Sequence, residues 1–184
     1  MSWLIWSVAA TVAAVCNLAF SQPSSDSPVA TSCELVKLPE RFKGSIVKVR
    51  AQILIAFEDF RLDTAACEGK KIDGAWLEYG NGPKRQPVTW CCGDMIPRDP
   101  LPLLQNSDFK KFHRYLTAQS RTSACHEGQC YLYRVTATLT GRLDTAPFDK
   151  NGYCTSGYGH FNFHCARLVI HSVSDVVATK LLHP

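Results

Sequence analysis

The sequence predicts a mostly β domain: a small five-stranded barrel of OB-like strand order, stapled by disulfide bonds, with one helix between its third and fourth strands. Three observations support this fold class. Several segments alternate apolar and polar residues with period two, as half-buried strands do. Convincing helical spacing occurs in one segment only, between the third and fourth of these strands. Eight cysteines follow an apolar N-terminal stretch, which is typical of exported domains with disulfide bonds.

The first three predicted strands lie in the first half of the chain. Residues 46–57 alternate β-branched and charged residues, and this segment is long enough to curl or bulge. A second alternating segment covers 59–64, and a third, 75–79, ends at the turn signal Gly80-Asn81-Gly82-Pro83. Residues 88–91 add a short extra strand or an extended arm.

The helix and the last two strands follow a proline-rich stretch. Aromatic residues and leucine recur three and four positions apart over roughly 108–119, with Ser107 as the expected N-cap. We interpret this stripe as core packing. Residues 131–143 form the clearest strand, and 166–177 form the last one. Five strands with a helix between the third and fourth follow the OB-like order, although an irregular β-sandwich would give a similar pattern.

The N-terminal segment predicts export. The first 20 residues contain no charged side chain and are rich in Ala and Val, and a polar stretch follows them. Ala19-Phe20-Ser21 fits a cleavage site, so we predict a signal peptide over 1–21 and a secreted or periplasmic protein. Cleavage would remove Cys16 and leave an even number of cysteines. The alternative is an uncleaved membrane anchor.

The rest of the chain has the length of one domain. We expect an N-terminal arm or linker over 22–44 and a single β-rich domain over 45–184. The 20 basic and 16 acidic residues give a formal net charge of +4, and the two signs are interleaved. This pattern gives no strong nucleic-acid or membrane signature, and the partner is unknown.

A long loop between the last two predicted strands, about 144–165, is rich in glycine and aromatic residues. In OB-type barrels this loop flanks the ligand face, so its aromatic side chains and those of the third strand could stack on bases or sugars. The alternative is that the loop packs its aromatic side chains onto the barrel. The candidate ligand-binding residues are Trp76, Tyr79, Tyr158, His160, Phe161 and His164.

Histidines and cysteines near this loop resemble a metal-ligand cluster. His160 and His164 lie close to Cys154 in sequence, and the segment 125–130 also combines Cys with His. The spacing is irregular and no Cys-x-x-Cys occurs, so we expect these thiols in disulfides and predict neither a metal nor another cofactor.

No catalytic motif is complete. His126-Glu127 begins like the zinc-protease signature His-Glu-x-x-His, but its fifth residue is Cys130. The adjacent acids Glu58-Asp59 are expected in a turn between two strands rather than as a catalytic pair. We therefore predict no catalytic residue.

The cysteines after residue 21 are the disulfide candidates. Loop lengths favour the local pairs Cys125–Cys130 and Cys154–Cys165. Cys67 is expected to reach one of two neighbouring cysteines across the third-strand hairpin, and Cys33 to take the other. The full set is Cys33, Cys67, Cys91, Cys92, Cys125, Cys130, Cys154 and Cys165.

Four short segments carry a resemblance: Phe57-Glu58-Asp59-Phe60, Trp76-Leu77-Glu78-Tyr79, Gly157-Tyr158-Gly159-His160 and the segment 168–175. They resemble an uncharacterised family of small exported bacterial proteins with an OB-like strand and helix order. The resemblance implies export and no known activity. The sequence thus favours a non-enzymatic exported barrel that binds a partner or acts structurally. The alternatives are an OB-type oligonucleotide or oligosaccharide binder and a secreted metal enzyme that uses His160 and His164.

Overall fold

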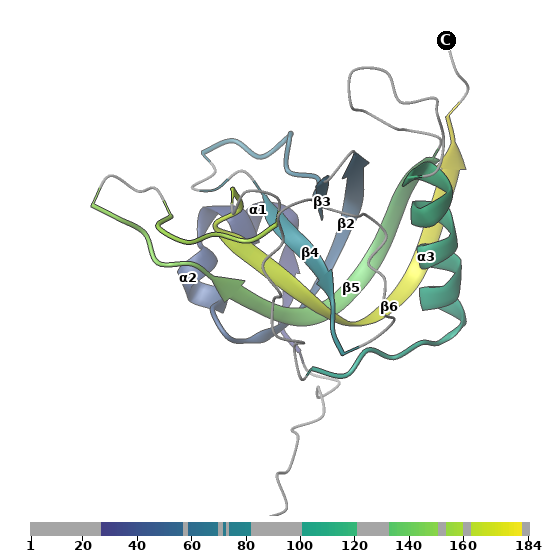
Figure 1. Cartoon of the computed structure of the whole chain (residues 1–184), viewed down its shortest axis with the longest axis horizontal. Helices are drawn as coiled ribbons and strands as arrows, with labels where there is room; N and C mark the ends of the chain where they lie inside the picture. The colour runs from purple at the N-terminus through teal and green to yellow at the C-terminus, as the bar shows by residue number, and fades with distance from the viewer. Residues whose placement is uncertain are drawn as a thin grey trace, which may run out of the picture.

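The structure is a computed structural model that describes residues 27–56, 59–69, 72, 74–81, 101–120, 133–150, 154–159 and 163–181. Within these ranges the chain forms a short strand β1 (Val29–Thr31), the helices α1 (Ser32–Lys37), α2 (Pro39–Phe42) and α3 (Ser107–Ser120), and five further strands (Figure 1).

The five further strands close into a barrel. They are β2 (Ile46–Ala56), β3 (Asp59–Leu62), β4 (Ala75–Tyr79), β5 (Tyr133–Thr145) and β6 (Ala166–Lys180). The antiparallel pairs β2–β3 and β3–β4 lead to the parallel pair β4–β6, and β6–β5 and β5–β2, both antiparallel, close the ring. With α3 between β4 and β5, this arrangement confirms the predicted five-stranded barrel of OB-like order.

Alternation along each strand decides which side chains enter the barrel. In β2, Val47, Val49 and Ile53 are buried, whereas the intervening Lys48 and Arg50 are exposed. β5 alternates in the same way and pairs with β2 from Ile46–Arg142 to Ile53–Val135. Because the interior holds apolar side chains and the outside faces water, period two in the sequence was enough to locate these strands.

Helix α3 closes one end of the barrel through Phe109, Phe112 and Leu116, which are all buried. Its N-cap is Asn106 rather than the expected Ser107. The Asn106 Oδ1 accepts a hydrogen bond from the Phe109 backbone N–H (2.8 Å), and its amide also donates to the Val173 carbonyl of β6 (3.4 Å). The asparagine therefore caps the helix and fixes it to the barrel at once.

The segment predicted to be an arm or linker, 22–44, carries regular structure from Val29 to Phe42. β1 adds to β2 as a parallel strand, and α1 begins with a capping box in which Thr31 and Glu34 bond each other's backbone N–H groups. Leu35, Val36 and Phe42 are buried. In Figure 1, α1 and α2 lie at the end of the barrel opposite α3.

Two disulfides fall within the described residues. Cys154–Cys165 confirms the predicted local pair. The expectation that Cys67 bonds a cysteine beyond the third strand is wrong, because Cys67 bonds Cys33 instead. Helix α1 brings Cys33 to the loop after β3, with a Cα–Cα distance of 5.3 Å. The remaining candidates, Cys91, Cys92, Cys125 and Cys130, lie outside the described residues.

Two other expectations also fall outside the described ranges, namely the signal peptide over 1–21 and the short extended segment 88–91. Among the helices of the described ranges, none combines the length and apolar character that a membrane crossing requires.

Candidate functional site

A row of side chains crosses the outside of four neighbouring strands, in the order β3, β4, β6 and β5. Arg61 stands opposite Trp76, Trp76 opposite Arg167, and Arg167 opposite Asp144. The row points away from the barrel interior, because the residues next to its members in the chain are buried in the core: Leu62, Leu77, Leu168 and Leu143. We call this row and the groups bonded to it the outer-face cluster.

Four charged side chains of the outer-face cluster neutralise one another. Arg167 donates from Nη1 to Glu78 Oε2 (2.9 Å) and from Nη2 to Asp144 Oδ2 (2.7 Å). Arg142 donates to both oxygens of Asp144, at 2.7 and 2.9 Å. The side chains of Arg167 and Glu78 are only 12% and 9% exposed. Charges this deep need partners, and two guanidiniums with two carboxylates satisfy that need without net charge.

The pKa shifts agree with fixed charges. Burial by itself would raise the pKa of Asp144, but the hydrogen bonds from Arg142 and Arg167 hold it below its ordinary value. Burial likewise opposes the charged form of Arg167, yet the carboxylates of Glu78 and Asp144 raise its pKa. Both groups therefore stay ionised at neutral pH and act as fixed charges that hold the strands together, rather than as proton donors or acceptors.

The loop between β5 and β6 covers this face. The Arg167 guanidinium lies over the Tyr158 ring, 4.8 Å from its centroid, in a cation–π contact. The His164 ring lies 5.4 Å from the ring of Trp76. The backbones of Tyr158 and His164 exchange two hydrogen bonds (2.7 and 3.1 Å), so both rings belong to one turn of the loop. Trp76 is completely buried under this turn.

Gly159 allows the β5–β6 loop to pack directly on the Trp76 ring. A Cβ atom at this position would lie 2.4 Å from a carbon of the Trp76 ring, and the φ of +73° is one that L side chains rarely adopt. Position 159 therefore requires glycine for two reasons: there is no space for a side chain, and the backbone adopts a left-handed conformation.

Asp59 fixes the loop from the neighbouring strand. It begins β3 rather than lying in the expected turn, and its Oδ2 is 2.8 Å from Arg61 Nε. Its Oδ1 is 3.7 Å from His164 Nε2, so a protonated His164 would form an ion pair with it. Contacts from β3, β4 and β6 thus all reach the same turn of the loop.

The structure brings together three of the predicted ligand-binding residues, Trp76, Tyr158 and His164. Tyr79 is separate, because it lies three positions from Trp76 in β4 and so faces the other side of the strand. There it contacts Phe109 of α3, with ring centroids 5.1 Å apart, and its hydroxyl lies 3.3 Å from His113 Nδ1. Burial raises the pKa of Tyr79.

Trp76 and Tyr79 are both buried, so neither offers a ring face to a ligand in this arrangement. The other two candidates, His160 and Phe161, lie outside the described residues.

The sequence did not single out the charged members of the cluster. Glu78, Arg142, Asp144 and Arg167 are far apart in the chain, and only the strand register makes them neighbours. Asp59, Glu78 and Tyr158-Gly159, which also belong to this face, come from three short segments that the sequence analysis had quoted for other reasons.

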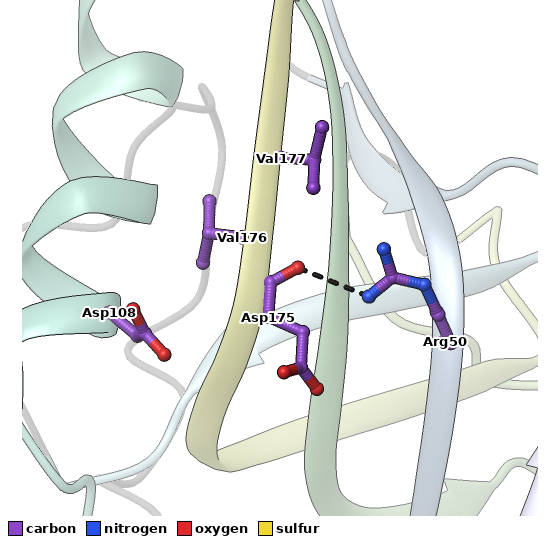
Figure 2. A pocket seen from close by; sticks show the side chains of 5 residues that line it. All are labelled: Arg50, Asp108, Asp175, Val176 and Val177. Atoms are coloured by element: carbon purple, nitrogen blue, oxygen red, sulfur yellow. Dashed lines mark hydrogen bonds between the residues drawn. The ribbon is translucent and has the colours of Figure 1, made fainter.

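A second feature is an open hollow between the start of α3 and β6 (Figure 2). It is lined by Arg50, Asp108, Asp175, Val176 and Val177. β6 bulges here, since Asp175 and Val176 together face a single residue of β5, and Asp175 has a φ of +52°. Arg50 Nη1 donates to the Asp175 carbonyl (3.1 Å) and so holds the bulge in place.

Comparison with known proteins found no matching family model, no similar curated protein and no similar solved structure. Within the described part of the chain, no three His, Cys, Asp or Glu side chains are grouped as metal ligands would be. The geometry of the two features above is therefore the basis for a functional proposal.

We predict that Gly159→Ala detaches the loop from Trp76. The left-handed φ and the contact with the ring together should lower the free energy of unfolding by about 2–4 kcal/mol. In a chain that starts at Gln22 and carries Trp90→Phe, Trp76 is the remaining tryptophan, and its emission should shift to longer wavelength. Gly69→Ala is the matched control, because its φ is +60° but no atom lies within 4 Å of the added Cβ. An equal effect of both substitutions would contradict the close contact.

A second prediction concerns pH. The pKa of Asp144 is lowered in the folded protein, so its stabilising contribution is complete above the unfolded value of about 3.9 and is lost as pH falls through the folded value. Asp144→Asn should therefore cost about 1.5–3 kcal/mol of unfolding free energy at pH 7 and less near pH 3, which is below the unfolded value. Denaturant titrations at the two pH values measure the difference. Glu68→Gln, an exposed site, is the control, and a cost for Asp144→Asn that does not depend on pH would refute a fixed charge at Asp144.

Proposed function

We propose that the protein is an exported, non-enzymatic OB-type barrel domain that acts by binding a partner or by its structure. The observation that carries this proposal is that the β5–β6 loop covers the outer-face cluster and packs against it. OB-type barrels bind ligands on the face of their second and third strands, beside the loop between strands four and five. Here those strands are β3 and β4, and that loop lies over them with its own aromatic rings.

The disulfides support export. Cys33–Cys67 and Cys154–Cys165 are consistent with an oxidising compartment, because thiols in the cytosol are kept reduced. The first bond joins α1 to the loop after β3, and the second closes the base of the β5–β6 loop. Each bond therefore fixes a segment outside the barrel strands, α1 or the β5–β6 loop, near the end of a barrel strand.

The electrostatics support a role without catalysis. A general acid or base works best when its pKa lies near the working pH. The pKa of Asp144 is lowered, away from neutrality, and its two oxygens accept three hydrogen bonds from Arg142 and Arg167, which is typical of a structural carboxylate. The His164 ring packs against Trp76 and faces Asp59 rather than open space.

One observation favours the alternative of an oligonucleotide or oligosaccharide binder. Arg61, Arg142 and Arg167 lie on the same face as Trp76 and Tyr158, which is the combination of cations and rings that single strands stack on. Opening of the β5–β6 loop would expose this combination. The two functions therefore differ in whether the loop moves.

Export is tested by the state of the thiols. Intact cells that produce the full chain are treated with a membrane-permeant alkylating reagent, and the protein is mapped by mass spectrometry without reduction. We expect Cys33, Cys67, Cys154 and Cys165 to be unlabelled and bonded as described. Two or more labelled thiols at neutral pH would contradict an exported, disulfide-containing protein.

The closed face is tested by releasing the loop. Removal of the Cys154–Cys165 bond by Cys154→Ser with Cys165→Ser should lower the unfolding free energy by about 3 kcal/mol, as expected for a loop of this size. We expect oligo-dT and neutral oligosaccharides to bind neither the native protein nor this variant in calorimetry. The control is Cys33→Ser with Cys67→Ser, which removes the bond between α1 and the loop after β3 and leaves the Cys154–Cys165 bond in place. Binding that appears only when the loop is released would favour the alternative function.

A further inference from the structure

We propose that the outer face of β1, β2, β5 and β6 is a binding surface for an acidic polysaccharide, a polymer that carries sulfate or carboxylate groups. This face shares β5 and β6 with the outer-face cluster but uses other residues of these strands, and we call it the polar face. The inference rests on the proposed function in one respect, since export would bring the protein into contact with such polymers.

Two adjacent cross-strand rows form the centre of the polar face. Each row takes one residue from each of the four strands, so neighbouring side chains are about 5 Å apart across the strands and the rows about 7 Å apart along them. Five of the eight members carry a hydroxyl group and two carry a positive charge. The rows are Val29, Lys48, Thr140, Ser172 and Thr31, Arg50, Thr138, Ser174.

These side chains point outward, because the residues that lie between the two rows are buried in the core. On β1 and β2 the intervening residues are Ala30 and Val49, and on β5 and β6 they are Leu139 and Val173. Thr136 continues the hydroxyl column of β5 and Arg134 ends it. The result is an array of hydroxyl groups with cations on β2 and β5. Thr140 and Ser172 lie at its centre, Thr138 is nearly buried, and the hydroxyls of Thr31 and Ser174 bond to the carboxylates of Glu34 and Asp175.

The cations of the polar face are not neutralised by carboxylates. Lys48, Arg50 and Arg134 are exposed, and within the described residues none of the three forms an ion pair. Arg50 donates to the Thr138 hydroxyl (3.3 Å) and to the Asp175 carbonyl (3.1 Å), which are both neutral. Its guanidinium is therefore oriented by the sheet while its charge remains available to an anion.

The hollow of Figure 2 limits the polar face on the β6 side. Arg50 reaches toward β6 from β2, and Asp175 and Asp108 lie beyond it toward α3. These two carboxylates would repel an anionic chain that crosses β6. A bound polymer is therefore expected to follow β2 and β5, where Lys48, Arg50 and Arg134 lie, rather than to enter the hollow.

The chemistry of the polar face suits a polysaccharide better than a nucleic acid. Guanidinium groups bind sulfate and carboxylate through paired hydrogen bonds, and threonine and serine hydroxyls can bond to sugar hydroxyls. Single-stranded nucleic acids are held largely by stacking on aromatic rings. The two rows contain no aromatic residue, so they supply charge and hydroxyl groups without a stacking platform.

The test uses heparin as the probe and the disulfide-bonded protein. Lys48→Gln with Arg134→Gln should weaken heparin binding at least about tenfold and make its salt dependence shallower, since fewer counterions are displaced. Lys37→Gln with Lys150→Gln removes the same charge from exposed positions elsewhere and should have little effect. Asp175→Asn should strengthen binding, and asparagine tolerates the left-handed φ at that position.

The outcomes separate this inference from the proposed function. Heparin affinity that is equal in the native protein and in the Lys48 and Arg134 double variant, with unchanged melting temperatures, would overturn the polar face as the binding surface. Oligo-dT bound as tightly as heparin would also overturn it, because general polyanion attraction would then suffice. Absence of heparin binding in a protein whose cysteines are bonded in cells refutes this inference alone, whereas free cysteines in cells refute the proposed export.

Discussion

The outer-face cluster and the loop that covers it depend on the interactions of one side chain, Arg167. It lies on β6, which pairs with β4 on one side and with β5 on the other, and it bonds Glu78 on β4 and Asp144 on β5. Its guanidinium also lies over Tyr158 of the β5–β6 loop. A charge that is nearly buried must have partners, so the positions of Glu78, Asp144 and the loop are linked through a single group. Removal of Arg167 would take away the cation that Glu78 and Asp144 share and would leave Asp144 paired with Arg142.

The closed loop follows from this neutralisation. A loop that covered unpaired charges would bury them at high cost, whereas a set of two cations and two anions is covered without that cost. Gly159 then removes the steric obstacle above Trp76, and Cys154–Cys165 holds the two ends of the turn together. Charge pairing, close approach and the covalent bond therefore favour one position of the loop, and none of them requires a ligand.

The sequence predicted most of the barrel because burial in a barrel repeats every two residues, as β2 and β5 show. It did not predict β1, α1 and α2, because elements of three to six residues are too short to show a period. The Thr31 and Glu34 capping box was a local signal for α1, and with α1 the Cys33–Cys67 bond also escaped prediction. Trp76 and Tyr79 could have been separated from sequence, since three positions along a strand reverse the face.

The pairing of charged residues that are distant in the chain could not be predicted from the sequence. Glu78 and Arg167 are 89 residues apart, and their contact depends on the register of the parallel β4–β6 pair. A shift of one residue would turn Arg167 into the core and make the pair impossible. The local pair Arg142 and Asp144, two residues apart on β5, was visible in principle, but without the register nothing showed that both belong to a larger cluster.

The two outer faces of the barrel use charge in opposite ways. In the outer-face cluster, Arg142 and Arg167 bond to carboxylates and Arg167 also lies over the Tyr158 ring, so little electric field extends into solvent. On the polar face, the partners of Arg50 among the described residues are neutral oxygens, and Lys48 and Arg134 are exposed on the same two strands. Long-range attraction of a partner requires charge that the protein has not already neutralised. Between these two faces, electrostatic recognition is therefore expected at the polar face, even though the aromatic side chains that first suggested a binding site lie on the outer-face cluster.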